Sequence, residues 1–189
     1  MSDKQYGMVI DTKRCFGCQT CTVSCKVCNE VVDDLYLSRV ESLDGTRIYQ
    51  ATGTFPSCRL AFRPLLCNHC EAPACVANCP TGAMAKDEAT GIVTSDPDVC
   101  IGCGTCVASC PYDMPVIDEK TARSIKCNFC APRIENGEEP YCVESCPGRA
   151  RFFGDLNDPD SAVSKLIAEG NAIQYLPEEG TEPSVWYLE

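Results

Sequence analysis

Cysteine is the residue type that defines this sequence, because 18 of the 189 residues are cysteine. Most of these cysteines fall into four motifs in which short, fixed spacers separate four thiols. The motifs are Cys15-x2-Cys18-x2-Cys21-x3-Cys25, Cys67-x2-Cys70-x4-Cys75-x3-Cys79, Cys100-x2-Cys103-x2-Cys106-x3-Cys110 and Cys127-x2-Cys130-x11-Cys142-x3-Cys146. Two-residue spacers let a short turn wrap three thiolates around a compact inorganic core, and the fourth cysteine of such a motif ligates a neighbouring cluster. The spacing therefore predicts four [4Fe–4S] clusters, held by motifs that work in pairs.

Other uses of cysteine fit the spacing less well. Cys103-x2-Cys106-x20-Cys127-x2-Cys130 matches a four-cysteine zinc spacing, but this choice leaves Cys100 unexplained. A disulfide scaffold needs an oxidising compartment, and the first residues have no charged and then apolar stretch typical of a secretion signal. A single histidine gives histidine-rich zinc sites and Ser–His–Asp chemistry almost no material.

Net charge and hydropathy limit the kinds of partner that this chain can bind. The formal net charge is −11, and an acidic surface repels nucleic acid and anionic lipid. We therefore expect no nucleic-acid partner. No run approaches the roughly 18–20 apolar residues that cross a bilayer, so we expect no membrane span.

The elements that must position these motifs are expected to be short. Residues 8–11 are predicted to form a strand that leads into motif one. Asp44-Gly45 is typical of a hairpin turn, and the end of the chain has helical spacing after Asp158. The expected elements are the strand 8–11, hairpins over 39–49 and 83–94, one amphipathic helix after Asp158 and an extended strap over 183–188.

The gaps between motifs suggest how they pair. Only 20 residues, which span the second hairpin, separate motif two from motif three, so these two motifs are expected to form one small unit. Motifs one and four then pair over a long sequence separation and enclose it. The fold class we expect is α+β, with two intertwined bacterial-ferredoxin-like modules, short hairpins and helices, and little regular secondary structure. The inner module is 58–119, and the outer module is 1–57 plus 120–189 with the C-terminal helix and tail.

Four stretches extend the pattern beyond cysteine spacing. They are Cys67-Asn68-His69-Cys70-Glu71-Ala72-Pro73, Cys79-Pro80-Thr81-Gly82-Ala83, Cys110-Pro111-Tyr112 and Phe153-Gly154-Asp155-Leu156-Asn157-Asp158-Pro159. With the four motifs, they make nearly the whole chain resemble the four-cluster ferredoxin-type beta subunits of the dimethyl-sulfoxide-reductase family of molybdenum and tungsten oxidoreductases. The family includes the iron–sulfur subunits of polysulfide, thiosulfate, tetrathionate and dimethyl sulfoxide reductases. One departure is Lys26, which follows motif one where the other motifs have proline.

The resemblance implies four ligand sets, which we number as sites. Site one is Cys15, Cys18, Cys21 and Cys146, and site two is Cys25, Cys127, Cys130 and Cys142. Site three is Cys67, Cys70, Cys75 and Cys110, and site four is Cys79, Cys100, Cys103 and Cys106. All sixteen positions are cysteine, so the resemblance gives no reason to expect a three-iron centre.

The function implied by the resemblance is one-electron transfer through four [4Fe–4S] clusters, with no catalytic residue in this chain. The expected partners are a catalytic subunit with the molybdenum or tungsten cofactor and a membrane anchor subunit that handles quinol. The chain is expected in the cytoplasm, or at the membrane or in the periplasm when it is exported bound to a signal-bearing catalytic partner. Two alternatives stay open: a free-standing soluble polyferredoxin, and a cluster that itself binds substrate.

A few residues outside the sixteen have two interpretations each. Cys28 and Cys58 are interpreted as plain thiols, buried or near a cluster, against a disulfide or a spare ligand. His69 is expected to make a structural hydrogen bond, against a role in tuning a cluster. Lys26 and Arg59 are equally consistent with offsetting cluster charge and with ordinary solvation. Trp186, Tyr187 and Phe152 are expected to pack rather than relay electrons.

Overall fold

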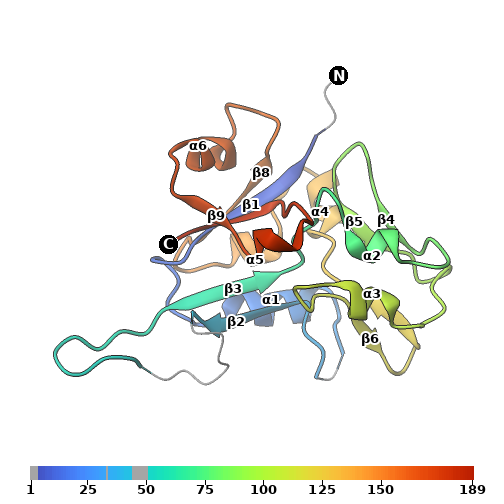
Figure 1. Cartoon of the computed structure of the whole chain (residues 1–189), viewed down its shortest axis with the longest axis horizontal. Helices are drawn as coiled ribbons and strands as arrows, with labels where there is room; N and C mark the ends of the chain where they lie inside the picture. Colours follow the sequence, from blue (N-terminus) through green and yellow to red (C-terminus); the bar gives the residue numbers. More distant parts are fainter. Residues whose placement is uncertain (1–3, 33, 44–50) are drawn as a thin grey trace.

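A computed structural model describes residues 4–32, 34–43 and 51–189, and its helices and strands are all short (Figure 1). The strands are β1 (Tyr6–Asp11), β2 (Ser38–Ser42), β3 (Phe62–Leu66), β4 (Met84–Lys86), β5 (Val93–Ser95), β6 (Val116–Asp118), β7 (Arg123–Ile125), β8 (Arg151–Asp155), β9 (Ala172–Gln174) and β10 (Val185–Leu188). The helices are α1 (Thr20–Cys28), α2 (Ala74–Ala77), α3 (Thr105–Ser109), α4 (Ala131–Glu135), α5 (Tyr141–Glu144), α6 (Ala162–Ala168) and the 3-10 helix η1 (Pro177–Glu179). This mixture confirms the expectation of a small α+β fold.

The largest sheet joins the two ends of the chain. Its strand order is β8-β1-β10-β9, with β1 parallel to β10 and antiparallel to β8. The predicted strand at 8–11 is thus confirmed, and the predicted strap ends in β10. Met8 and Ile10 lie in the main core with Val185 and Tyr187. Strand side chains alternate between faces, so Val9, which is fully buried, points to the opposite face.

Helix α6 covers that opposite face. The predicted helix after Asp158 is confirmed, because Ser161 caps α6 by accepting a hydrogen bond from the Ser164 N–H at 3.1 Å. Val163, fully buried, packs against β8, where a side chain on Gly154 would lie 3.1 Å from it. The helix therefore closes the sheet on the side away from most of the thiols.

Three two-stranded hairpins complete the fold: β2–β3, β4–β5 and β6–β7. The predicted hairpin over 83–94 is confirmed by the β4–β5 register. In the first predicted hairpin, however, β2 pairs with β3, and the expected return strand at 46–49 lies outside the described residues. Apolar burial explains this choice, because Phe62, Leu65 and Leu66 of β3 are buried in the core.

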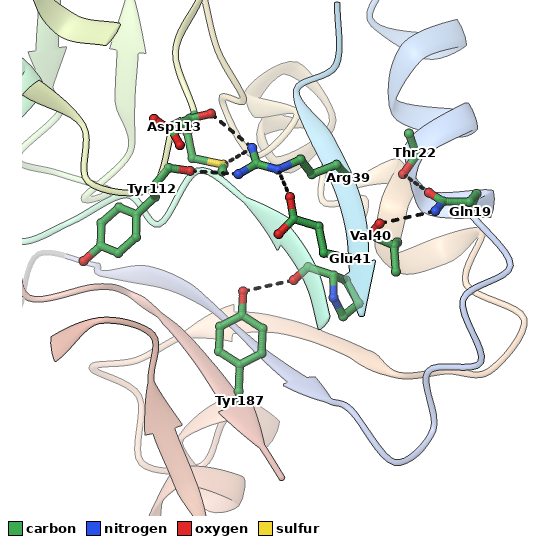
Figure 2. Close-up of polar contacts among 10 residues, drawn as sticks. Gln19, Thr22, Arg39, Val40, Glu41, Tyr112, Asp113 and Tyr187 are labelled. Atoms are coloured by element: carbon green, nitrogen blue, oxygen red, sulfur yellow. Dashed lines mark hydrogen bonds and ion pairs between the residues drawn. The ribbon is translucent and has the colours of Figure 1, made fainter. Parts of the chain in front are cut away.

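Arg39 ties β2 to the segment that follows motif three (Figure 2). Its guanidinium donates to the carbonyl of Asp113 at 3.1 Å and to that of Tyr112 at 3.2 Å. The same group pairs with Glu41 at 2.8 Å. Nearby, the Tyr187 hydroxyl donates to the Pro64 carbonyl at 3.0 Å, which fixes β10 against β3. These contacts join segments far apart in the sequence.

No helix in the described part of the chain is both long and apolar enough to cross a membrane.

Candidate iron–sulfur sites

Short helices present the thiols in pairs that lie one turn apart. Helix α1 carries Cys21 and Cys25, both buried, and α5 carries Cys142 with Cys146 just beyond its end. Residues four apart lie on the same face of a helix, so each pair can serve two adjacent sites. Helix α1 packs against α5, and in the same way α2 packs against α3. The Ser24 hydroxyl, 2.7 Å from that of Ser145, links α1 to the turn after α5.

The loop between the first two cysteines has the same backbone form in all four motifs. The residue before the second cysteine has a positive φ in each case: 74° at Gly17, 42° at His69, 69° at Gly102 and 54° at Phe129. Successive backbone N–H groups in such turns point inward and bind anions. N–H groups accordingly donate to thiol sulfurs in the described structure, and one example is Gly102 to Cys100 at 3.4 Å.

The four cysteines expected at site four line a single hollow. The hollow has no charged side chain in its lining. The Met84 N–H donates to Cys79 at 3.4 Å, and the Ser124 N–H donates to Cys100 at 3.3 Å. The bond from Met84 is the main reason that the pKa of Cys79 is lowered to about 7. The hydrogen bond from Met84 therefore stabilises the thiolate form of Cys79.

The four cysteines expected at site two line another hollow, also without charged side chains. The Asn29 amide lies 3.7 Å from the Cys25 sulfur and 4.0 Å from that of Cys130. Burial, reinforced by neighbouring thiolates, raises the pKa of Cys25 to about 12 and also raises that of Cys142. Several thiolates can share so dry a space only with a cationic core between them.

The other two groups are recognised by the charges that their thiols exert on one another. Burial, together with the charges of Cys67 and Cys110, raises the pKa of Cys70 to about 11 and that of Cys75 to about 12. Burial likewise raises the pKa of Cys15, and Cys21 and Cys146 add to this effect. These neighbours match sites three and one. Cys18 of site one is exposed, with its thiol 3.3 Å from the Thr20 hydroxyl.

The chemistry of these donor sets fits an iron–sulfur cluster. Within the described residues, no three His, Cys, Asp or Glu side chains are arranged to hold a single metal ion. The four cysteines of the zinc spacing are also divided, because Cys103 and Cys106 line one hollow whereas Cys127 and Cys130 line the other. Thiols spread around an uncharged hollow, with N–H groups directed at their sulfurs, suit a polynuclear core.

The residues outside the sixteen thiols have plain environments. Cys28 and Cys58 are both free thiols, as expected, and both are exposed, so the alternative that they are buried was wrong for each. Residues 51–61 are exposed throughout, and in Figure 1 they project from the body. Arg59 lies in this arm, where its backbone forms an isolated antiparallel β-bridge with Thr52. The ammonium of Lys26 donates to the Leu35 carbonyl at 3.0 Å.

His69 makes the structural hydrogen bond that the sequence predicted. Its Nδ1 accepts from the Val93 N–H at 3.0 Å, and its ring stacks on Phe129 with centroids 3.7 Å apart. The side chain is fully buried, and burial, together with the charge of Lys126, holds its pKa well below the usual range. His69 is therefore neutral, with its proton on Nε2, which has no partner within the described structure.

Two buried cations near the thiols were missed by sequence reasoning. Arg151 begins β8, and Lys126 directly precedes motif four. The sequence directed attention to Lys26 and Arg59 because these residues lie close to cysteines along the chain. The signal for Arg151 was its place at the start of an apolar strand, Arg151-Phe152-Phe153, where alternation can turn a charged residue inward.

Comparisons with known proteins agree with this geometry. Residues 58–156 match the family model described as a 4Fe-4S dicluster domain. The chain is 42% identical to one subunit of the tetrathionate reductase of Salmonella typhimurium, over 97% of this chain and 72% of the relative. It is 34% identical to the arsenate respiratory reductase iron-sulfur subunit of a Shewanella species, over 96% of this chain and 95% of the relative. It is 38% identical to one subunit of the sulfite dehydrogenase of Allochromatium vinosum, over 97% and 82%.

Proposed function

Since this chain belongs to the 4Fe-4S dicluster family, together with the iron–sulfur subunits of respiratory reductases, we propose that it relays single electrons through four [4Fe–4S] clusters. The observation that carries this proposal is the grouping of its thiols around uncharged hollows. When bound, each cluster accepts and releases one electron at a time. The chain itself holds the clusters and keeps water away, and does no bond chemistry.

We assign the sixteen cysteines to the four sites given above. The shared hollows support sites two and four. The mutual charge effects among Cys67, Cys70, Cys75 and Cys110 support site three. For site one, Cys21 and Cys146 both help to raise the pKa of Cys15, and Cys18 lies in the same loop as Cys15.

We also propose two intertwined ferredoxin-like modules, with 58–119 inside and 1–57 plus 120–189 outside. The contact of α2 with α3 supports the inner module, and the contact of α1 with α5 supports the outer one. In Figure 1 the hairpin β4–β5 with α2 and α3 lies at one end, and the four-stranded sheet with α6 lies at the other.

The sites follow one another in a line. Helix α1 carries ligands of sites one and two one turn apart. Cys127 of site two lies close enough to Cys67 of site three for the Cys67 thiolate to help raise the pKa of Cys127. Cys75 and Cys79, one turn apart at α2, link sites three and four. Electrons can therefore move between neighbouring clusters from site one to site four, in either direction.

Exposed apolar residues at both ends of this line favour a fixed subunit over a free polyferredoxin. Phe16 beside Cys15 is 59% exposed, and Ile101 beside Cys100 is 62% exposed. Cys18 and Cys103, one in each of the two motifs, are also exposed. Burial of these two side chains against other subunits would remove their apolar surface from water. We propose that one end meets a molybdenum or tungsten catalytic subunit and the other a membrane subunit that handles quinol.

The relatives carry the names of reductases and of a dehydrogenase. We propose that the catalytic partner sets the direction of electron flow.

Iron analysis and electron paramagnetic resonance (EPR) test the proposal. Anaerobically purified protein is expected to contain about sixteen irons per chain and to give four reducible [4Fe–4S] signals. Co-purification is expected to recover a catalytic subunit with a molybdenum or tungsten cofactor. About four irons per chain, or a stable monomer with no partner, would contradict the assignment.

A further inference from the structure

Two cations are buried among the thiols. Arg151 is 4% exposed and Lys126 is 7% exposed. A buried charge is strongly destabilising unless an opposite charge compensates it. In the residues described by the structure, neither side chain is ion-paired with an Asp or Glu, whereas Arg133 pairs with two glutamates. The charges that compensate Arg151 and Lys126 must come from elsewhere.

Arg151 lies between sites one and two. Its guanidinium hydrogen-bonds to the Cys21 thiol and lies 3.4 Å from the Ser38 hydroxyl and 3.6 Å from the Met8 sulfur. Burial alone would lower the pKa of Arg151, but Cys21 and Cys142 raise it strongly. Cys21 belongs to site one and Cys142 to site two. Helices α1 and α5, which carry Cys21 and Cys142, pack against each other, and α5 also contacts β8, so the guanidinium lies within reach of both sites.

Lys126 lies between sites two and three. Its ammonium donates to the Cys127 carbonyl at 2.6 Å and to the Val93 carbonyl, which fixes it in place. Burial raises the pKa of Cys127 and of Cys75, and the charge of Lys126 opposes the rise in both. Cys127 belongs to site two and Cys75 to site three, so this ammonium is also shared.

We propose that Arg151 and Lys126 are shared counter-charges, each of which raises the reduction potentials of two adjacent clusters together. The inference rests on the function proposed above. Reduction adds one negative charge to a site, and a fixed cation in a low-dielectric interior favours that charge. An electron that leaves site one for site two stays within reach of Arg151, and one that moves on to site three stays within reach of Lys126.

Site four differs from the other three. Neither its hollow nor the hydrogen bonds to its thiols in the described structure include a lysine or arginine. Backbone N–H groups from Met84, Gly102 and Ser124 favour negative charge there instead. The proposal therefore predicts a pattern in which site four is insensitive to both cations.

The test is a redox titration followed by EPR on the intact complex. Arg151→Gln is expected to shift two of the four midpoint potentials to more negative values. Lys126→Gln is also expected to shift two of the four midpoint potentials to more negative values. The cluster of site two is expected to respond to both variants. The charge-preserving variants Arg151→Lys and Lys126→Arg are expected to retain most of the wild-type potentials.

The matched control is Arg133→Gln. Arg133 lies in α4, next to a site-two ligand, but it is already paired with Glu138 and Glu144, so its loss is expected to leave all four potentials unchanged. Unchanged potentials in an iron-replete Arg151→Gln variant, or equal shifts in all four clusters, would overturn the proposal. If Arg151→Gln fails to load iron, rescue by Arg151→Lys supports a charge role, whereas failure of both variants overturns it.

Cluster content of the wild-type protein distinguishes failure of the counter-charge role from failure of the proposed function. Four clusters in the wild type without the expected shifts would remove the role of the cations alone, whereas a wild type without four clusters would remove the proposed function itself.

Discussion

Two glycines in the loop of motif three offer a matched test of how that loop holds its cluster. Gly102 and Gly104 both have left-handed backbones, with φ of 69° and 75°. A Cβ atom on Gly102 would lie 2.2 Å from the Ala122 carbonyl oxygen, whereas one on Gly104 would meet nothing within 4 Å. The two alanine variants thus share the backbone strain and differ in the clash.

The expected magnitudes follow from that difference. A left-handed backbone costs alanine about 1–2 kcal/mol relative to glycine. Overpacking adds about 1–3 kcal/mol at Gly102 only, so its total is about 2–5 kcal/mol. Relief of the clash must also move the Gly102 N–H away from the Cys100 sulfur, which it meets at 3.4 Å. Gly102→Ala should therefore weaken site four, whereas Gly104→Ala should leave it loaded.

The assay is iron content and the rate of cluster loss on anaerobic heating. Gly104→Ala is expected to keep about sixteen irons, and Gly102→Ala about twelve, with the loss confined to one EPR signal. Full iron content and wild-type loss rates in Gly102→Ala, or equal damage in both variants, would refute the reasoning.

Three further predictions concern helix contacts and thiol chemistry. Replacement of Ser24 and Ser145 by alanine, singly and together, should give a coupling energy of about 1 kcal/mol in thermal unfolding; strict additivity would argue against their 2.7 Å contact. Val163→Ala should lower the free energy of unfolding by about 2 kcal/mol because the Val163 side chain of α6 is fully buried. An unchanged melting temperature would contradict that packing. In iron-free protein at pH 7, iodoacetamide should label Cys79, with a pKa of about 7, well before Cys75, with a pKa of about 12. Thiolate is the reactive form, so labelling of Cys79 should rise with pH and level off above 7. Mass spectrometry of the peptides measures the labelled fraction of each cysteine, and urea should abolish the difference between Cys79 and Cys75. Equal labelling of the two cysteines without urea would count against the hydrogen bonds at Cys79.

Local signals were the part of the fold that the sequence predicted well. The helix capped by Ser161 and the hairpin of β4 and β5 depend on neighbouring residues, and both are present. The pairing of β2 with β3 depends instead on burial of Phe62 and Leu66 in a core assembled from the whole chain. An Asp-Gly turn signal carries no information about that core.

Cysteine spacing likewise identified the thiols but not their surroundings. The four-residue steps at α1 and α5 place ligands one turn apart, which follows from helix geometry. Burial of Arg151 and Lys126 depends on which strands pack over them, and the strand alternation that marks Arg151 does not say what covers it. The left-handed backbone at Phe129 was also unexpected, because a bulky residue rarely adopts it.

The pairing of β1 with β10 gives cofactor loading an order in time. On the ribosome, every ligand proposed for sites three and four, from Cys67 to Cys110, is translated before Cys142 and Cys146. The sheet beside sites one and two closes only when residues 185–188 reach the strand at Tyr6–Asp11. The ligands of sites three and four are thus complete in the nascent polypeptide before those of sites one and two, and the sheet beside the latter two sites forms later still.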